Sequence, residues 1–245
     1  MIRYRSLFHF LSLLIVFLSV GFLAPILVAF IYNDGSQIAL ILSFFVTLGF
    51  GGILWFFTRG EIDLRLREGF AVVSLGWLAC AIFGALPFYF SGEANITNSF
   101  FESMSGFTTT GASIFPKPAE LPEGILFWRS FTHWVGGMGI IVFSIAILPL
   151  LGTGGISMMK AEMPGPTVEK IKPRIQDAAK SYWKVYVLIS AAEAVLLKIG
   201  GMNWFDSLCH TFGTMATGGF STKNESIAFY NDQPFIQYVI IFFML

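Results

Sequence analysis

Charged residues are scarce in this 245-residue chain. They make up 12% of the sequence, against roughly 25% in ordinary soluble domains. The formal net charge is zero, so the charge balance gives no argument for a nucleic-acid partner. The two cysteines, Cys80 and Cys209, lie in apolar surroundings without metal-like spacing, and we expect both to be reduced packing residues. These scarcities argue against a soluble domain, a nucleic-acid-binding protein and a disulfide-stabilised scaffold.

Long apolar runs take the place of the missing charge. Apolar residues make up 55% of the chain, and several runs reach the length of about 20 residues that is needed to cross a bilayer. The runs are residues 8–32, 38–57, 69–90, 125–151 and 182–199. A sixth begins near Phe235 and stops at Leu245, too short to span, so we expect the chain to be a fragment of something longer. Pro25 is expected to kink the first run. The sequence predicts an all-α polytopic membrane protein.

The basic residues predict the orientation of these spans. Most of the fifteen Lys and Arg residues precede the first run, lie between the second and third, or surround the connection before the fifth. The positive-inside tendency assigns these segments, and the N-terminus, to the cytoplasm. Residues 91–124 and 200–234 then face outward.

Both outward segments carry the same kind of motif. A Phe-acid-Ser triplet at residues 101–103 leads to a Thr/Gly run at 108–112, and a second triplet at 205–207 leads to a run at 216–220. Such a segment predicts a half-helix that enters the membrane and returns as extended chain, which is allowed only where it is buried in protein or lines a water-filled cavity. The repetition favours a pore over ordinary glycine-mediated helix packing.

Each half-helix has an expected beginning. Asn98 or Ser99 is the expected cap of the first and Asn203 of the second, with Glu102 and Asp206 in the first turns, where the helix dipole favours an anion. Glu102 and Asp206 are therefore interpreted as cap or pore-mouth charges. The spacing from triplet to glycine is three residues longer in the second segment, which predicts a half-helix nearly one turn longer.

These segments are expected to bind a cation that has lost its hydration shell. Extended residues such as Thr109, Thr110 and Gly111 can direct successive carbonyl oxygens toward one axis, where they replace the hydration shell of a large monovalent ion. Half-helix C-termini aimed at the midplane add partial negative charge. His210 lies in the second half-helix, where it is a candidate to line or brace the loop. Arg129 and Glu193 are further suspects, because ionisable residues at membrane depth are functional by default.

Other readings of the sequence are weaker. The glycines of residues 136–139 lie inside a span with no preceding strand, which favours helix packing over a nucleotide-binding turn. No Ser/His, paired Asp or zinc-ligand constellation suggests an intramembrane enzyme. A secondary transporter for another solute would use broken helices around a midplane cavity, and it stays as an alternative class.

Four motifs give the chain a family resemblance. They are residues 100–112 (FFESMSGFTTTGA), 134–141 (WVGGMGII), 161–166 (AEMPGP) and 216–221 (ATGGFS). The chain resembles the Trk/Ktr/HKT superfamily of potassium transporters, and within it the bacterial TrkH and TrkG type. Members carry four repeats of helix, re-entrant loop and helix around one pore. By that resemblance, this chain contains the following parts: a leading helix pair (1–68), a first pore repeat (69–151), a cytoplasmic linker (152–181) and an incomplete second repeat (182–245).

The resemblance implies potassium uptake across the bacterial cytoplasmic membrane, with potassium as substrate and no other cofactor. It also implies a homodimer in the lipid bilayer that binds a cytosolic nucleotide-sensing subunit of the TrkA type. Gly111 and Gly218 would be the selectivity glycines, since a Ser at the first filter position goes with sodium permeation. Sodium permeation or ion-coupled transport on the same architecture is the alternative. The implied filter residues are Thr109, Thr110, Gly111, Ala112, Ala216, Thr217, Gly218 and Gly219, and the pore-mouth or supporting residues are Glu102, Asp206 and His210.

Overall fold

Helices account for the regular structure of the described chain. The computed structural model describes residues 4–59, 66–151 and 171–245, and the all-helical prediction is confirmed over these ranges. The α-helices are α1 (Tyr4–Gly21), α2 (Leu23–Tyr32), α3 (Gln37–Thr58), α4 (Leu66–Gly84), α5 (Leu86–Phe90), α6 (Ile96–Phe107), α7 (Glu123–Leu151), α9 (Ile171–Ile199), α10 (Trp204–Met215) and α11 (Pro234–Met244). Two short 3₁₀ helices are η1 (Pro118–Glu120) and η3 (Ser226–Tyr230).

The long helices coincide with the predicted spans. Among the described residues, Tyr4–Tyr32, Gln37–Thr58 and Gly69–Phe90 are long and apolar enough to cross a membrane. The helices α7 and α9 have 29 residues each, and a helix of that length is about 44 Å long, more than the roughly 30 Å of a hydrocarbon core. Residues 152–170 of the expected linker lie outside the described residues. Its remainder, 171–181, forms the beginning of α9.

The packing of α3 is typical of a helix surrounded by lipid. It buries Ser43, Thr47 and Gly51, and it exposes large apolar side chains such as Phe45 and Phe57. A Cβ on Gly51 would lie within 3.1 Å of α1 atoms, so the missing side chain lets the two helices approach closely.

The first span is broken at Phe22, as Pro25 predicts. The helix α1 ends at Gly21 and α2 begins at Leu23. Proline has no amide hydrogen to donate to the carbonyl four residues earlier, which here belongs to Gly21. The effect expected of Pro25 is found as an interruption of the helix at one residue.

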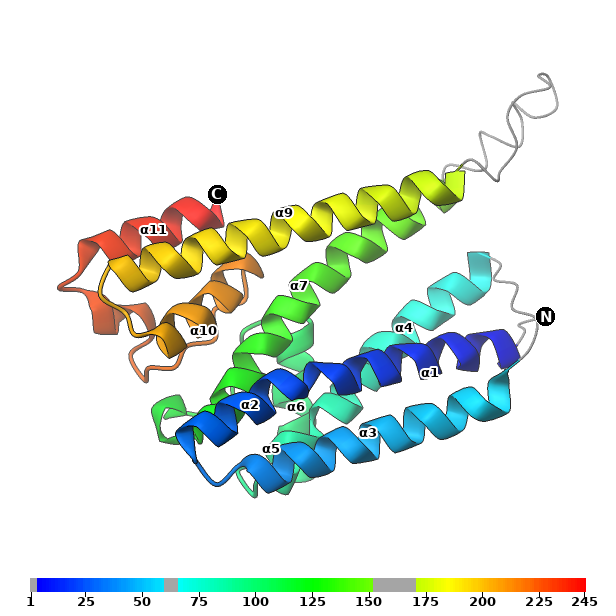
Figure 1. Ribbon diagram of the computed structural model, residues 1–245, viewed down its shortest axis with the longest axis horizontal. Coiled ribbons are helices and arrows are strands. Elements are labelled where there is room, and N and C mark those ends of the chain that lie inside the picture. Colours follow the sequence, from blue (N-terminus) through cyan, green and yellow to red (C-terminus); the bar gives the residue numbers. More distant parts are fainter. Residues whose placement is uncertain (1–3, 60–65, 152–170) are drawn as a thin grey trace.

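The helix α7 connects the two halves of the structure. Figure 1 shows it running between the leading helices, in blue and cyan, and the α9–α11 group, in yellow to red. Trp128 on α7 is 1% exposed, and its indole nitrogen donates to the Gly84 carbonyl at 2.9 Å. The same ring packs against Phe22 and Phe107, the last residue of α6. This cluster fixes α7 against the leading helices and the first half-helix.

Candidate functional site

The half-helices α6 and α10 have one design. Each contains 12 residues and begins after an Asn cap, and a helix of that length is about 18 Å long, too short to span a bilayer. Asn95 accepts the amide of Asn98 at 2.9 Å, and Asn203 accepts the amide of Asp206 at 2.7 Å. The expected cap at Asn98 or Ser99 is therefore wrong, since α6 begins a turn earlier. The cap at Asn203 is confirmed.

Both half-helices end in the same strained turn. Thr109 and Thr217 follow the helices with φ of 56° and 51°, a left-handed conformation that a β-branched residue rarely adopts. The amide of the next residue closes the turn onto a carbonyl five positions back, which is Ser105 at 3.0 Å in the first loop and Gly213 at 2.9 Å in the second. This pattern is a Schellman ending in which Thr stands where Gly is usual. It redirects the chain into the Thr/Gly loop.

The two segments match with a constant shift of 108 positions. The shift holds from the Asn caps to Gly111 and Gly219, which have φ of 74° and 93°. The Phe-acid-Ser triplets are 104 positions apart and so are out of register by four residues, about one helical turn. The expectation of a longer second half-helix is wrong, because it was counted from the two triplets, which do not occupy equivalent positions in the two helices. His210, not Asp206, is the structural equivalent of Glu102.

The two Thr/Gly loops meet backbone to backbone. A Cβ on Gly111 would overlap the carbonyl oxygen of Gly218. Only glycine permits this approach, and the positive φ of Gly111 excludes other residues for a second reason. Thr110 and Thr217 are exposed beside this contact. Gly111 and Gly218, expected to act together, are brought into contact.

Glu102 anchors the first loop from behind. It lies in the second half of α6 and is fully buried, so its expected place in the first turn is wrong. One carboxylate oxygen accepts Ser113 Oγ at 2.9 Å and Arg129 Nε at 2.6 Å, and the other accepts the Ile114 amide at 2.9 Å. A buried, fully paired carboxylate is not a pore-mouth charge, whereas the supporting role expected as its alternative fits this geometry.

Asp206 anchors the second loop in an analogous way. It lies in the first turn of α10, as expected, and accepts Thr222 Oγ1 at 2.5 Å, Lys223 Nζ at 2.8 Å and Tyr230 Oη at 3.2 Å. Burial by itself raises the pKa of Asp206, but hydrogen bonds from Lys223 and Thr222 outweigh it and lower the pKa from its ordinary value of 3.8. Each half-helix thus ties the chain after the Thr/Gly run to one of its acids.

One stripe of α7 lies against both loops. Arg129, His133, Gly136 and Gly137 are spaced so that they share a helix face. A Cβ on Gly136 would overlap the carbonyl oxygen at the end of α6, and one on Gly137 would lie 3.0 Å from the Ala216 Cβ at the end of α10. These glycines serve close packing, as the sequence predicts.

Two buried histidines support the second loop. His133 is fully buried, stacks on Phe220 with ring centroids 4.0 Å apart, and would be overlapped by a Cβ on Gly218. His210 is 3% exposed, and its ring meets the edge of Tyr230 at 5.7 Å. His133 packs behind the loop. His210 also lines a cavity with Thr217, Gly218 and Gly219, so the bracing and the lining roles expected for it both fit its position.

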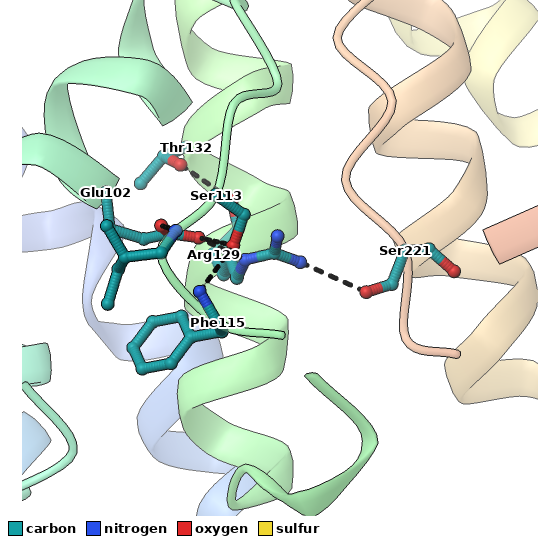
Figure 2. Close-up of polar contacts among 7 residues, drawn as sticks. Glu102, Ser113, Phe115, Arg129, Thr132 and Ser221 are labelled. Atoms are coloured by element: carbon teal, nitrogen blue, oxygen red, sulfur yellow. Dashed lines mark hydrogen bonds and ion pairs between the residues drawn. The ribbon is translucent and has the colours of Figure 1, made fainter. Parts of the chain in front are cut away.

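Arg129 links the two loops, which sequence reasoning missed. It was suspected only as an ionisable residue at membrane depth, with no partner assigned. Figure 2 shows its guanidinium between Glu102 of the first repeat and Ser221 of the second. One signal was available: Glu102 and Arg129 carry opposite charges in a chain in which charged residues are scarce.

No group of three or more His, Cys, Asp or Glu residues in the described ranges is arranged to hold a metal ion. The polar groups concentrated at the site are backbone carbonyls and Thr hydroxyls, with Thr108 Oγ1 and Thr110 Oγ1 2.8 Å apart. Carbonyl oxygens on two converging half-helices, set among membrane-crossing helices, suit a large monovalent cation. Fold and site are those of an all-helical membrane protein that transports cations.

Comparison with known proteins identifies the family. The TrkH family model, described as "Cation transport protein", matches residues 36–245, and the chain belongs to this family. The family is one of transport proteins and not of enzymes.

Several relatives are similar over nearly the whole chain. The Trk system potassium uptake protein TrkH of Escherichia coli K12 is 46% identical over 247 residues, which cover 99% of this chain and 51% of the relative. The Trk system potassium uptake protein TrkG of the same strain is 36% identical over 93% of this chain and 48% of the relative. The crystal structure of the potassium transporter TrkH from Vibrio parahaemolyticus matches with a TM-score of 0.86 at 39% identity, covering 99% of this chain and 49% of the other. The chain spans about half the length of these relatives.

Proposed function

We propose that this chain supplies two of the four filter loops of a potassium uptake pore. The observation that carries the proposal is the contact between Gly111 and the Gly218 carbonyl, which places two Thr/Gly loops face to face at the ends of two half-helices. The potassium named for the relatives supports the choice of ion.

In this mechanism potassium is the substrate, and backbone carbonyls replace its hydration shell. The proposed ligand segments are 109–112 and 216–219, with Gly219 taking the place that Gly111 has in the first loop. Glu102, Asp206 and His210 support the loops from behind and do not touch the ion. The half-helix dipoles add negative potential at the C-terminal ends of α6 and α10.

The proposed setting is the bacterial cytoplasmic membrane, with the N-terminus in the cytoplasm and both Thr/Gly loops reached from outside. The leading pair (1–68) and the two pore repeats (69–151 and 182–245) are the proposed parts. A homodimer and a cytosolic TrkA-type subunit are the proposed partners, as the family resemblance implies. The basic segments assigned to the cytoplasmic side are the proposed contact for such a subunit.

Growth complementation tests the proposal. The full-length protein should restore growth at limiting potassium in cells that lack their own uptake systems, and variants at Gly111 or Gly218 should not. Rescue by sodium-dependent uptake alone would instead favour the sodium-permeable or ion-coupled alternative. Unimpaired rescue by both glycine variants would remove the filter assignment.

A further inference from the structure

Arg129 contacts three residues in two parts of the site. Its Nε donates to Glu102 Oε1 at 2.6 Å, and its Nη1 donates to the Ser221 carbonyl at 3.0 Å. Its Cζ lies 3.6 Å from the centre of the Phe220 ring. The side chain is 3% exposed. One buried guanidinium therefore touches the first half-helix and the second Thr/Gly loop at once.

The contact reaches the first loop through Glu102. The same carboxylate accepts Ser113 Oγ and the Ile114 amide, two and three residues after Gly111. A continuous chain of hydrogen bonds thus runs from the first loop, through Glu102 and Arg129, to Ser221 in the second loop (Figure 2).

Only arginine has the geometry for this role. The guanidinium is planar, carries five donors in a fixed fork and stacks on aromatic faces, so it holds two acceptors and a ring in one arrangement. A lysine in its place is a single point charge that can satisfy Glu102 but cannot also reach Ser221 and stack on Phe220.

Among the residues that the structure describes, the acid of the second half-helix takes part in no matching link to the other repeat. His210 occupies the place of Glu102 there, and Asp206 makes its contacts within its own repeat, to Thr222, Lys223 and Tyr230. The cross-repeat connection in the described structure is therefore made by Arg129.

We propose that Arg129 is a positioning residue that sets the spacing between the two filter loops and thereby ion selectivity. The inference rests on the proposed function. Arg129 holds Ser221 of the second loop at a fixed distance from Glu102, which is bonded to the first loop. Because Gly111 and Gly218 lie on these same two loops, the link also fixes how closely the two glycines approach.

The test compares potassium and sodium uptake by the full-length protein carrying Arg129→Lys, with the membrane level of each variant measured on blots. We expect potassium uptake to persist and the potassium-to-sodium ratio to fall at least several-fold. Lys117→Gln is the control, because Lys117 pairs with Glu120 on the exposed side of the first outward segment, and its ratio should stay unchanged.

Two further variants separate positioning from folding. Glu102→Gln combined with Arg129→Gln removes both buried charges. The double variant should reach the membrane at the wild-type level, while its potassium-to-sodium uptake ratio should stay below the wild-type ratio. Phe220→Leu removes the stacking surface, leaves the ion pair in place and should lower the ratio to a smaller extent. An unchanged ratio in all of these variants, or failure of every one to reach the membrane, would overturn the proposal. If Gly111→Ser changes the ratio while these variants do not, the inference fails and the proposed function stands.

Discussion

Gly111 lies so close to the carbonyl oxygen of Gly218 that the two loops touch through their backbones alone. The residues are 107 positions apart and belong to different half-helices. Their contact is one of the places at which the two repeats meet, and a side chain at this point would force the loops apart.

We expect Gly111→Ser to raise sodium permeation relative to potassium and to reduce potassium uptake. The added Cβ overlaps the Gly218 carbonyl and requires a left-handed φ of 74°, so the ligand oxygens move outward. Isotope uptake at matched membrane levels measures the ratio. Gly35→Ser is the control, since Gly35 has φ of 85° with nothing within 4 Å of its Cβ position. Equal ratios for wild type and Gly111→Ser would contradict the expectation.

We expect Gly218→Ala to impair folding, because its Cβ overlaps the buried ring of His133. Overpacking of this kind costs about 1–3 kcal/mol. His133→Ala removes the ring, so the double variant should recover part of the lost thermal stability in detergent. If the double variant is as unstable as the sum of the two single changes, the ring is not the obstacle.

Gly136→Ala should destabilise the protein by about 1–3 kcal/mol, since its Cβ overlaps the Phe107 carbonyl at the end of α6. The matched control is Gly52→Ala on α3, where nothing lies within 4 Å of the Cβ position. That change should be neutral or stabilise by about 0.5–1 kcal/mol through helix propensity. Thermal unfolding of the two purified variants makes the comparison. Equal losses would show that α7 does not depend on this close approach.

The lowered pKa of Asp206 predicts that the protein loses stability in acid. Its folded pKa lies below the ordinary value of 3.8, so its stabilising contribution is present above that value and is lost as the pH falls through the folded pKa. Unfolding temperatures measured from about pH 7 down to about pH 3 should therefore depend less steeply on pH in Asp206→Asn. Glu120→Gln, in an ion pair that is two-thirds exposed, should keep the wild-type profile. A wild-type profile for Asp206→Asn would exclude this contribution.

The positions of the helices could be predicted from the sequence because each rests on a local property. The length of the apolar runs located the spans, and Pro25 located the break in the first. The Thr/Gly runs located both loops. Asn203 was found as a cap because it stands directly before an apolar half-helix with an acid three residues on.

The internal register of the site could not be read from one sequence. The two Phe-acid-Ser triplets are more alike than the segments that truly correspond, and their four-residue displacement is one helical turn, so both triplets keep the same helix face. Asn98 was expected as the cap in place of Asn95 because asparagine is a good cap at either position. The link from Glu102 through Arg129 to Ser221 depends on how α7 packs against both half-helices, and no local pattern contains that information.

The most direct test of the central claim is a crystal structure of the full-length protein in rubidium or thallium, two potassium substitutes with anomalous scattering. The account predicts anomalous density on the axis between the two loops, coordinated by carbonyl oxygens of residues 109–112 and 216–219. Density confined to other parts of the protein, or none at these carbonyls under conditions that support uptake, would contradict it.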